Sequence, residues 1–254
     1  KISFVREEIY SIKEKDNQWQ ISTRDIEGLE KTYHANFIID ASGRRSIMAL
    51  KMDLKRVKKD QLIGIHASVH LPTNVETSTI FPVNDGWWYI SKLPNGNHLV
   101  SHFTDADLCD KKLTRDGKLF ESFLLTQTEF IASIGLVKEE MALNFLGTKA
   151  SHSSIIDRNS SGNWIAIGDA AMTFDPLSSQ GMFNALVMAA QISKLIIQTN
   201  VVHTLSEQVK EAFHEESQRM IKDIWSHYEY HHFIYYSMEK RWSNEKFWRR
   251  RQII

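Results

Sequence analysis

The sequence of 254 residues contains a single cysteine, Cys109, and only four prolines. One cysteine excludes a disulfide within the chain and is typical of a reducing compartment, so the sequence predicts a cytoplasmic protein. Lysine and arginine total 31, as do aspartate and glutamate, which makes the formal net charge zero. A chain without net charge creates no long-range field for nucleic acid or an anionic membrane, and neither is predicted as a partner.

Long hydrophobic runs are also lacking. The most apolar stretch, residues 182–197, contains Asn184, Gln191 and Lys194, which predicts a buried helix and not a membrane span. A basic run over residues 44–59 has no interleaved aromatic side chains, and this favours a solvated surface over a nucleic-acid contact. With 42% hydrophobic residues, the chain can bury a core in one large domain or two smaller ones.

None of the eleven glycines belongs to a G-x-G pair. The glycine-rich turn that opens a dinucleotide-binding βαβ unit is therefore missing. The chain also begins without methionine, inside the alternating stretch KISFVREEIYSIKEK. Together these features predict a fragment that lacks an upstream part of about a hundred residues, the usual size of a nucleotide-binding unit.

The chain is rich in strands at first and helical at its end. Apolar and polar residues alternate up to the run FIID, which is followed by a glycine turn at Gly43. Five strand-like stretches between residues 55 and 148 predict an antiparallel sheet, interrupted by one helix over 117–135. From Ser178 the pattern is helical almost to the end. The predicted class is α/β with mixed α+β character. Three regions are predicted: a domain formed by 1–54 and 155–200, an antiparallel β-sheet domain over 55–154, and a helical region over 201–254.

The stretch GDAAMTFDPLSSQGMFNAL, which begins at Gly168, has the composition of a ligand-binding turn. It follows a short apolar strand, and open α/β sheets bind ligands at the carboxyl ends of their strands. Asp169 is suited to accept hydrogen bonds from ribose hydroxyls. Ala170 and Ala171 carry little side-chain bulk, so a flat ligand can lie close to the main chain.

The same stretch continues into a helix. Pro176 fixes the turn, and Ser178 or Ser179 is predicted to cap the helix by accepting a hydrogen bond from a free amide. Gly181 in the first turn lowers helix propensity by about 1 kcal/mol, which is tolerable where a ligand approaches the backbone. Free amides at a helix start favour an anionic ligand such as a diphosphate.

The stretch GDAAMTFDPLSSQGM resembles the second FAD fingerprint of monooxygenases of the para-hydroxybenzoate hydroxylase type and of flavin-dependent halogenases. FIIDASGRRS is similar to the turn by which the halogenase-like branch returns to FAD. The resemblance implies an incomplete FAD-binding domain at 1–54 and 155–200 and a substrate domain at 55–154. It also implies that Asp169 binds the FAD ribose. The implied FAD-binding residues are Ala41, Ser42, Gly43, Gly168, Asp169, Ala170, Pro176, Ser178, Ser179, Gln180, Gly181 and Met182.

Two further stretches, DGWWYISKLPNGNHLVSHFTDADL and RWSNEKFWRRR, are similar to one subgroup of that branch. The subgroup includes flavoproteins that modify a side chain of a partner enzyme during maturation of its quinone cofactor. The implied activity is that of an FAD-dependent monooxygenase, in which a flavin hydroperoxide passes oxygen to an electron-rich small molecule or protein side chain. The implied electron donor is NAD(P)H or a flavin reductase. No protein nucleophile is required, so no catalytic residue is assigned.

Three alternatives stay open. In a flavin-dependent halogenase, the lysine that directs hypohalous acid lies upstream in the family. The W-x-W-x-I-P motif of that family is altered here to GWWYIS, with Gly86 at the first tryptophan position and Ser91 at the proline position. An isoprenoid-type flavin reductase is the second alternative, because related folds reuse the Gly-Asp turn. The third is a non-enzymatic fragment that acts as a binding module.

Other side chains are weaker candidates. Trp87, Trp88 and Tyr89 are candidate walls of a substrate pocket, although only one side of a strand can face it, and His66 and His102 are candidate polar contacts. His227 and His231 stand four residues apart on a predicted helix, but no third ligand is evident and no metal site is predicted. The three arginines at 249–251 are open to two interpretations, a partner contact or a solubilising end.

Overall fold

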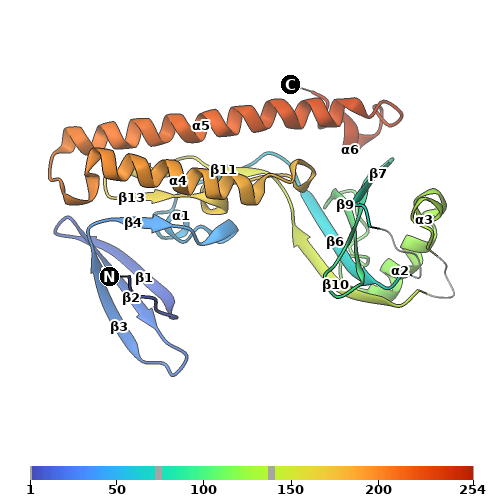
Figure 1. The fold of residues 1–254 in the computed structure, drawn as a ribbon, viewed down its shortest axis with the longest axis horizontal. Coiled ribbons are helices and arrows are strands. Elements are labelled where there is room, and N and C mark those ends of the chain that lie inside the picture. The colour runs from blue at the N-terminus through green and yellow to red at the C-terminus, as the bar shows by residue number, and fades with distance from the viewer. Residues whose placement is uncertain (1, 72–75, 137–140, 254) are drawn as a thin grey trace. The chain divides into compact units, whose positions relative to one another are not determined.

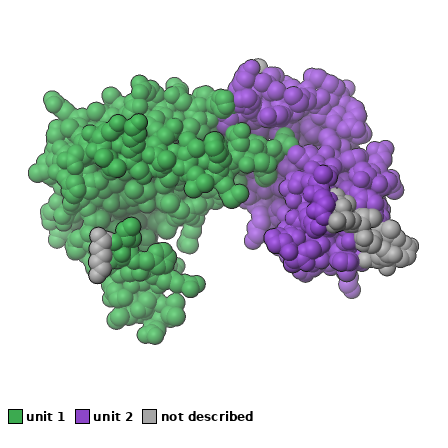
Figure 2. Space-filling view, in the orientation of Figure 1, with its two compact units in different colours: residues 1–58, 154–227 green, residues 59–153, 228–254 purple. Residues whose placement is uncertain are grey.

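The computed structural model describes residues 2–71, 76–136 and 141–253. The chain divides into two compact units, which Figure 2 shows in separate colours. Unit 1 comprises residues 1–58 and 154–227, and unit 2 comprises residues 59–153 and 228–254. Residues 201–254, which the sequence suggested as a separate helical region, are divided between the two units. The three predicted domain boundaries therefore stay a proposal.

Unit 1 contains three small sheets (Figure 1). An antiparallel meander is formed by β1 (Glu8–Lys15), β2 (Gln18–Arg24) and β3 (Glu30–Ala35). The second sheet contains β12 (Ser160–Ser161), β13 (Trp164–Ala166) and β4 (Ile38–Asp40), and the third contains β14 (Met172–Thr173), β11 (Ser154–Ile156) and β5 (Arg56–Lys58). The helices are α1 (Ile47–Lys51), α4 (Gly181–Thr199) and the first part of α5 (Glu207–Met238). Short 3₁₀ turns are η1 (Gly43–Arg45), η3 (Gly168–Ala170), η4 (Pro176–Ser178) and η5 (Val201–His203).

The pairing of β13 with β4 is parallel, with Ala166 beside Asp40. All three residues of β13 are fully buried, as expected for a strand covered on both faces. Because the strands are parallel, the turns that follow them lie at the same edge of the sheet. The turn after residue 40 and the turn after residue 167 therefore come together in space.

Helix α4 differs from its prediction. Only Met188 and Ile192 are buried, whereas Phe183, Leu186 and Ile197 are more than 60% exposed. The expectation of a buried helix is therefore wrong for the described chain. By length and composition α4 also meets the requirements of a membrane-crossing helix, with a mean hydropathy of 1.2, which is weak evidence for such a role. A cytoplasmic location stays a prediction.

Unit 2 is built on a five-stranded antiparallel sheet in the order β10-β6-β9-β8-β7. The strands are β6 (Leu62–Val69), β7 (Thr79–Val83), β8 (Gly86–Lys92), β9 (His98–Asp105) and β10 (Leu143–Ala150). The antiparallel sheet predicted for this region is confirmed. One face of it forms a hydrophobic core with α2 (Gly117–Leu125) and α3 (Thr128–Ile134), in which Trp88, Phe120 and Phe130 are fully buried.

The single helix predicted over 117–135 is in fact these two helices. Asp116 caps α2, because its carboxylate accepts hydrogen bonds from the amides of Lys118 and Leu119. At the other end, the Thr126 hydroxyl donates to the carbonyl of Phe123 over 2.6 Å. A hydroxyl that binds the preceding turn in this way competes with continuation of the helix.

The other face of the sheet contacts the end of the chain, including α6 (Lys246–Arg249). The Trp87 indole donates to the Tyr236 hydroxyl over 3.0 Å, and the Trp248 indole donates to the carbonyl of Val83 over 2.7 Å. The indole rings of Trp87 and Trp248 are both buried. The terminal segment is thus part of the packing of unit 2.

Two of the three terminal arginines fit neither interpretation, because they pair with carboxylates of their own unit. Arg251 is buried and forms an ion pair with the buried carboxylate of Asp105 over 2.6 Å. Arg250 pairs with the same carboxylate over 2.8 Å and with Asp107 over 2.7 Å. These contacts, together with Lys246, hold the pKa of Asp107 well below its usual range. Arg249 is exposed.

Candidate functional site

The candidate site begins at the carboxyl end of β4. The buried carboxylate of Asp40 accepts hydrogen bonds from the amides of Ser42 (2.9 Å) and Met48 (2.8 Å). Its main-chain carbonyl accepts from the amide of Ile167, directly before η3. Asp40 therefore shapes one turn and joins it to the other. Sequence reasoning did not assign this residue, although Asp two positions before Ser is a recognised turn signal.

The turn after Asp40 begins with two exposed residues. Ala41 and Ser42 are exposed, and Gly43 has a φ of 73°, a left-handed conformation that favours glycine. The Ser42 hydroxyl accepts a hydrogen bond from the amide of Ile47 over 2.9 Å. Side chains in this turn thus support the local backbone, and the Ser42 amide and the Gly43 carbonyl, which accepts from the amide of Ser46, already have partners within it.

The second turn, η3, follows β13. Gly168 has a φ of 56°, and a side chain there would approach the Cβ of Ala185 in α4 to 3.2 Å, so the turn packs closely against that helix. The side chain of Asp169 is 42% exposed and available to a ligand. Ala170 is fully buried, its amide donates to the carbonyl of Ile167 and its carbonyl accepts from Arg56, so this residue shapes the turn and exposes no group of its own.

The segment from η4 into α4 differs in detail from the predicted cap. The buried Asp175 carboxylate accepts from the amide of Leu177 over 2.8 Å and caps η4. Ser178 donates to the carbonyl of Asp175, and Ser179 adopts a left-handed φ of 51°. Neither serine caps α4, and among the described residues no side chain does so. The predicted serine cap is therefore wrong, because the intervening 3₁₀ turn moves the helix start to residue 181.

The first turn of α4 is open. A Cβ added to Gly181 would meet no atom within 4 Å, and the Met182 side chain is 84% exposed. No side chain of the described residues caps the start of this 19-residue helix, so its first amides can donate to an anionic or electron-rich ligand. The open space beside Gly181 and the amide donors of the first helical turn thus occur at the same point of the chain.

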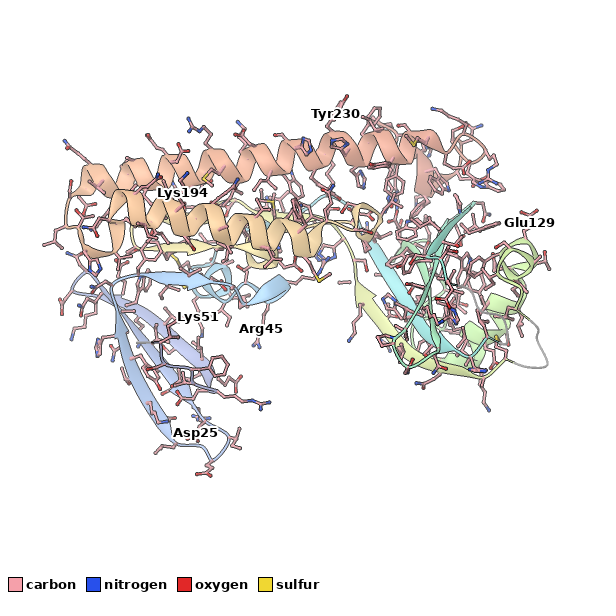
Figure 3. All side chains as sticks on the ribbon, viewed as in Figure 1. Asp25, Arg45, Lys51, Glu129, Lys194 and Tyr230 are labelled. Carbon is pink, nitrogen blue, oxygen red and sulfur yellow. The ribbon has the colours of Figure 1, made fainter. Side chains whose placement is uncertain are left out.

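Two arginines contact η3. Arg44 approaches the Asp169 carboxylate to 3.9 Å, and Arg56 donates to the main-chain carbonyl of Ala170 over 2.7 Å. Both belong to the basic run 44–59, for which a solvated surface was predicted. That prediction is wrong for these two residues, because their charges are directed at the candidate site. Arg45, labelled in Figure 3, is exposed and fits the prediction.

These features fit FAD. The carboxylate of Asp169 can accept hydrogen bonds from ribose hydroxyls, and the uncapped start of α4 favours a diphosphate or an electron-rich ring edge. The absence of neighbours around Gly181 permits close approach to the backbone. All of these residues belong to unit 1.

Comparisons with known proteins find relatives in sequence and in fold that are named as flavin-dependent or FAD-dependent. No family model matches the chain. The chain is 29% identical over 245 residues to LodB of Marinomonas mediterranea, a protein named as an FAD-dependent oxidoreductase. In structure it is similar to the flavin-dependent halogenase CmlS, with a TM-score of 0.76 at 19% identity over 98% of this chain and 45% of CmlS. This chain has the fold of the FAD-dependent monooxygenase and halogenase superfamily.

Two more solved structures support this result. The peptidyl tryptophan dihydroxylase QhpG gives a TM-score of 0.73 at 19% identity over 99% of this chain and 55% of QhpG. The myxobacterial chondrochloren halogenase CndH gives 0.76 at 22% identity over 98% of this chain and 58% of CndH. The chain spans 63% of the length of LodB and about half the length of these structures. The predicted fold class is confirmed, and LodB, CmlS and CndH are all named as flavin-dependent or FAD-dependent proteins.

Strand alternation separates the candidate substrate contacts. Trp88 stacks on His102 with ring centroids 4.6 Å apart, and both rings lie in the core beneath α2 and α3. Trp87 is buried against Tyr236 on the opposite face. Trp87, Trp88 and His102 therefore do not line an open surface of unit 2. Tyr89 and His66 are only partly buried.

His66 lies opposite Ser101 in the sheet, and Tyr89 lies on the other side of Ser101. The His66 Nδ1 atom is 2.7 Å from the Ser101 hydroxyl, and its ring contacts the edge of Phe103. Burial, and to a smaller extent the charge of Lys149, lower the pKa of His66 below 6.5. His66 is therefore a neutral hydrogen-bonding group at physiological pH.

We expect Lys149→Gln to raise the pKa of His66 without restoring 6.5, because burial is the larger cause. A titration of the His66 ring protons by NMR measures this shift, with exposed Lys112→Gln as the control. An unchanged pKa in Lys149→Gln would contradict the assignment. Because the folded-state pKa lies below the unfolded one, the unfolded chain binds the proton more tightly. Unit 2 should therefore lose stability as the pH falls below 6.5.

The described residues contain no group of three or more His, Cys, Asp or Glu side chains that could hold a metal ion. The thiol of Cys109 is half-buried, and burial, followed by Asp85 and Asp110, raises its pKa to about 11. Such a thiol is a poor nucleophile at neutral pH. Among the described residues, neither a metal-binding group nor the Cys109 thiol therefore forms a second reactive site.

Proposed function

We propose that this chain forms the flavin-contacting and substrate-contacting parts of an FAD-dependent monooxygenase. Unit 1 would bind FAD through the main chain and side chains of 41–43, 168–170 and 176–182. The observation that carries the proposal is the parallel pair β4–β13, which brings an exposed aspartate and two glycine turns from distant parts of the sequence to one sheet edge. The similarity to LodB, CmlS and QhpG supports it.

Each part of the site has a role in the proposal. The carboxylate of Asp169 accepts hydrogen bonds from ribose hydroxyls, while the free amides of α4 donate to the diphosphate or the electron-rich edge of the flavin. Gly181 allows the ring to approach the backbone. Bound FAD supplies the transfer of one oxygen atom from dioxygen to the substrate. The chain itself supplies binding, orientation and shielding from water.

The proposed substrate is electron-rich, either a small molecule or a protein side chain. The partly buried His66 and Tyr89, on one face of the unit 2 sheet, are the proposed contacts, since neutral imidazole can both donate and accept hydrogen bonds. QhpG is named as acting on peptidyl tryptophan in the biogenesis of a tryptophylquinone cofactor, and the shared fold favours testing side-chain substrates. The proposed electron donor is NAD(P)H or a flavin reductase.

Halogenation is the second candidate, because CmlS and CndH have the same TM-score of 0.76 with this chain, above the 0.73 of QhpG. Incubation of the natural full-length protein with reduced FAD, dioxygen, chloride or bromide, and monochlorodimedone separates the two reactions. Halide-dependent halogenation of this probe supports a halogenase. Absence of halogenated product with either halide, in protein that binds FAD, supports the monooxygenase.

The central test is FAD binding by the natural full-length protein that contains this chain. We expect purified protein to show flavin absorbance, and Asp169→Asn to weaken FAD binding about 10- to 100-fold, the effect of losing charge-assisted hydrogen bonds. Fluorescence titration measures the dissociation constant. The exposed Asp53, also in unit 1, provides the matched control Asp53→Asn. Full-length protein that takes up no FAD would overturn the proposed function.

A further inference from the structure

The Arg56 side chain contacts the main chain of the Gly168–Ala170 turn, although Arg56 lies over a hundred residues away in the sequence. Its Nη2 atom donates to the carbonyls of Asp169 (3.3 Å) and Ala170 (2.7 Å). Its Nη1 atom donates to the Ser154 hydroxyl over 3.0 Å, and that hydroxyl bonds to Thr173 over 2.8 Å. β5 and β11, which carry Arg56 and Ser154, are paired strands of the same small sheet. Hydrogen bonds thus hold both terminal nitrogens of the guanidinium in place.

These bonds determine the orientation of the turn. A carbonyl and the amide that follows it belong to one rigid peptide plane, so fixing two successive carbonyls fixes two successive planes. These are the planes between Asp169 and Ala170 and between Ala170 and Ala171; the first adjoins the Asp169 Cα and therefore helps to set the direction in which that side chain leaves the backbone. Arginine suits this task because its planar fork offers several donors in fixed geometry.

The charged side chains around the turn are arranged as expected for a site that binds an anionic ligand. Arg44 approaches the Asp169 carboxylate to 3.9 Å, with side-chain exposures of 34% and 42%. Arg56 is half-buried, and burial followed by the charge of Arg44 lowers its pKa. The positive charges of Arg44 and Arg56 repel each other beside the single carboxylate of Asp169. This arrangement is unfavourable for the isolated turn but suits a site that receives a diphosphate.

We propose that Arg56 is a positioning residue for FAD: it orients the Gly168–Ala170 turn so that the Asp169 carboxylate meets the ribose. Arg56 itself does not touch the cofactor. This inference rests on the proposed function, because it gives the turn its purpose. It assigns a role to a side chain outside the three segments 41–43, 168–170 and 176–182.

The test is a double-mutant cycle in the natural full-length protein, with the dissociation constant of FAD as the readout. We expect Arg56→Met to weaken FAD binding about 10-fold or more in the wild-type background. In the Asp169→Asn background the same change should have little effect, because Arg56 acts through Asp169. The exposed Arg45 of η1 provides the matched control, since Arg45→Met removes one charge from the same unit.

Each outcome has one meaning. If the wild-type protein binds no FAD, the proposed function fails. If the wild type binds FAD and Arg56→Met binds it equally well, the positioning role is overturned while the function stands. Equal losses in both backgrounds also overturn the role, because they show general support of the fold. If Arg56→Met does not fold, Arg56→Lys enters the same cycle; its single ammonium keeps the charge but not the fork, and the expected loss is smaller and still absent in Asp169→Asn.

Discussion

Replacing Arg251 with methionine is expected to lower the free energy of unfolding of unit 2 by about 3 kcal/mol, the lower end of the range for breaking a buried ion pair. The Arg251 and Asp105 side chains are only 2% and 1% exposed and are joined by hydrogen bonds of 2.6 and 3.1 Å. The guanidinium also donates to the carbonyl of Phe247 and lies 3.9 Å from that ring's centre. Methionine retains some packing but leaves a buried carboxylate short of donors. Arg250 still binds Asp105, which keeps the loss at the lower end.

Hydrogen exchange measured by mass spectrometry checks this prediction, because it reports opening free energies segment by segment. Protection should fall in β9, which ends at Asp105, and in α6, which ends two residues before Arg251, and less in unit 1. Exposed Arg249→Met removes a neighbouring positive charge and should leave protection unchanged. Equal behaviour of the two variants would show that the buried pair contributes little.

The terminal arginines also show a limit of sequence reasoning. RRR was open to two interpretations, a partner contact or a solubilising end, because no local pattern indicates which carboxylates it meets. The partners Asp105 and Asp107 lie more than 140 residues away and meet the arginines only in the folded unit. Arg56 was missed for the same reason, since the carbonyls it binds are 113 and 114 residues away. Long-range pairing of charges leaves no local pattern.

Local patterns, by contrast, were sufficient for much of the fold. Strand-like patterns predicted β1 to β3 and the five strands β6 to β10, because strand faces repeat every two residues, but they did not indicate β5. The same alternation explains why adjacent Trp87 and Trp88 have opposite surroundings, one against Tyr236 and the other against α2 and α3. What alternation could not indicate is which face each helix covers. His102 was accordingly a candidate contact that turned out to be a core residue.

The candidate FAD site was predictable where backbone geometry imposes residue type. Gly43 and Gly168 both adopt positive φ, and Asp169 follows the second of them with an exposed side chain. The helix cap was not predictable, because both serines and Asp175 are common capping residues. Only the structure shows that Asp175 caps a separate 3₁₀ turn and leaves α4 uncapped.

Replacing Gly86 with alanine is expected to destabilise unit 2 by at least about 3 kcal/mol, because overpacking of this severity exceeds what side-chain movement can absorb. A Cβ at Gly86 would lie 2.0 Å from the main-chain oxygen of Phe103, so β8 and β9 would have to separate. Gly181→Ala is the matched control, since a Cβ there meets nothing within 4 Å. Hydrogen exchange in β8 and β9 should increase strongly in the first variant only.

Near-native protection of β8 in Gly86→Ala would contradict the close approach of the two strands. The expected result also bears on halogenation. Gly86 occupies the first tryptophan position of the halogenase motif, and the packing of β8 on β9 leaves no room there for any side chain. The missing tryptophan therefore has a structural cause in this chain and says nothing about halide chemistry. For that reason the choice between oxygen transfer and halogenation depends on the halide-dependence of the product and not on this motif.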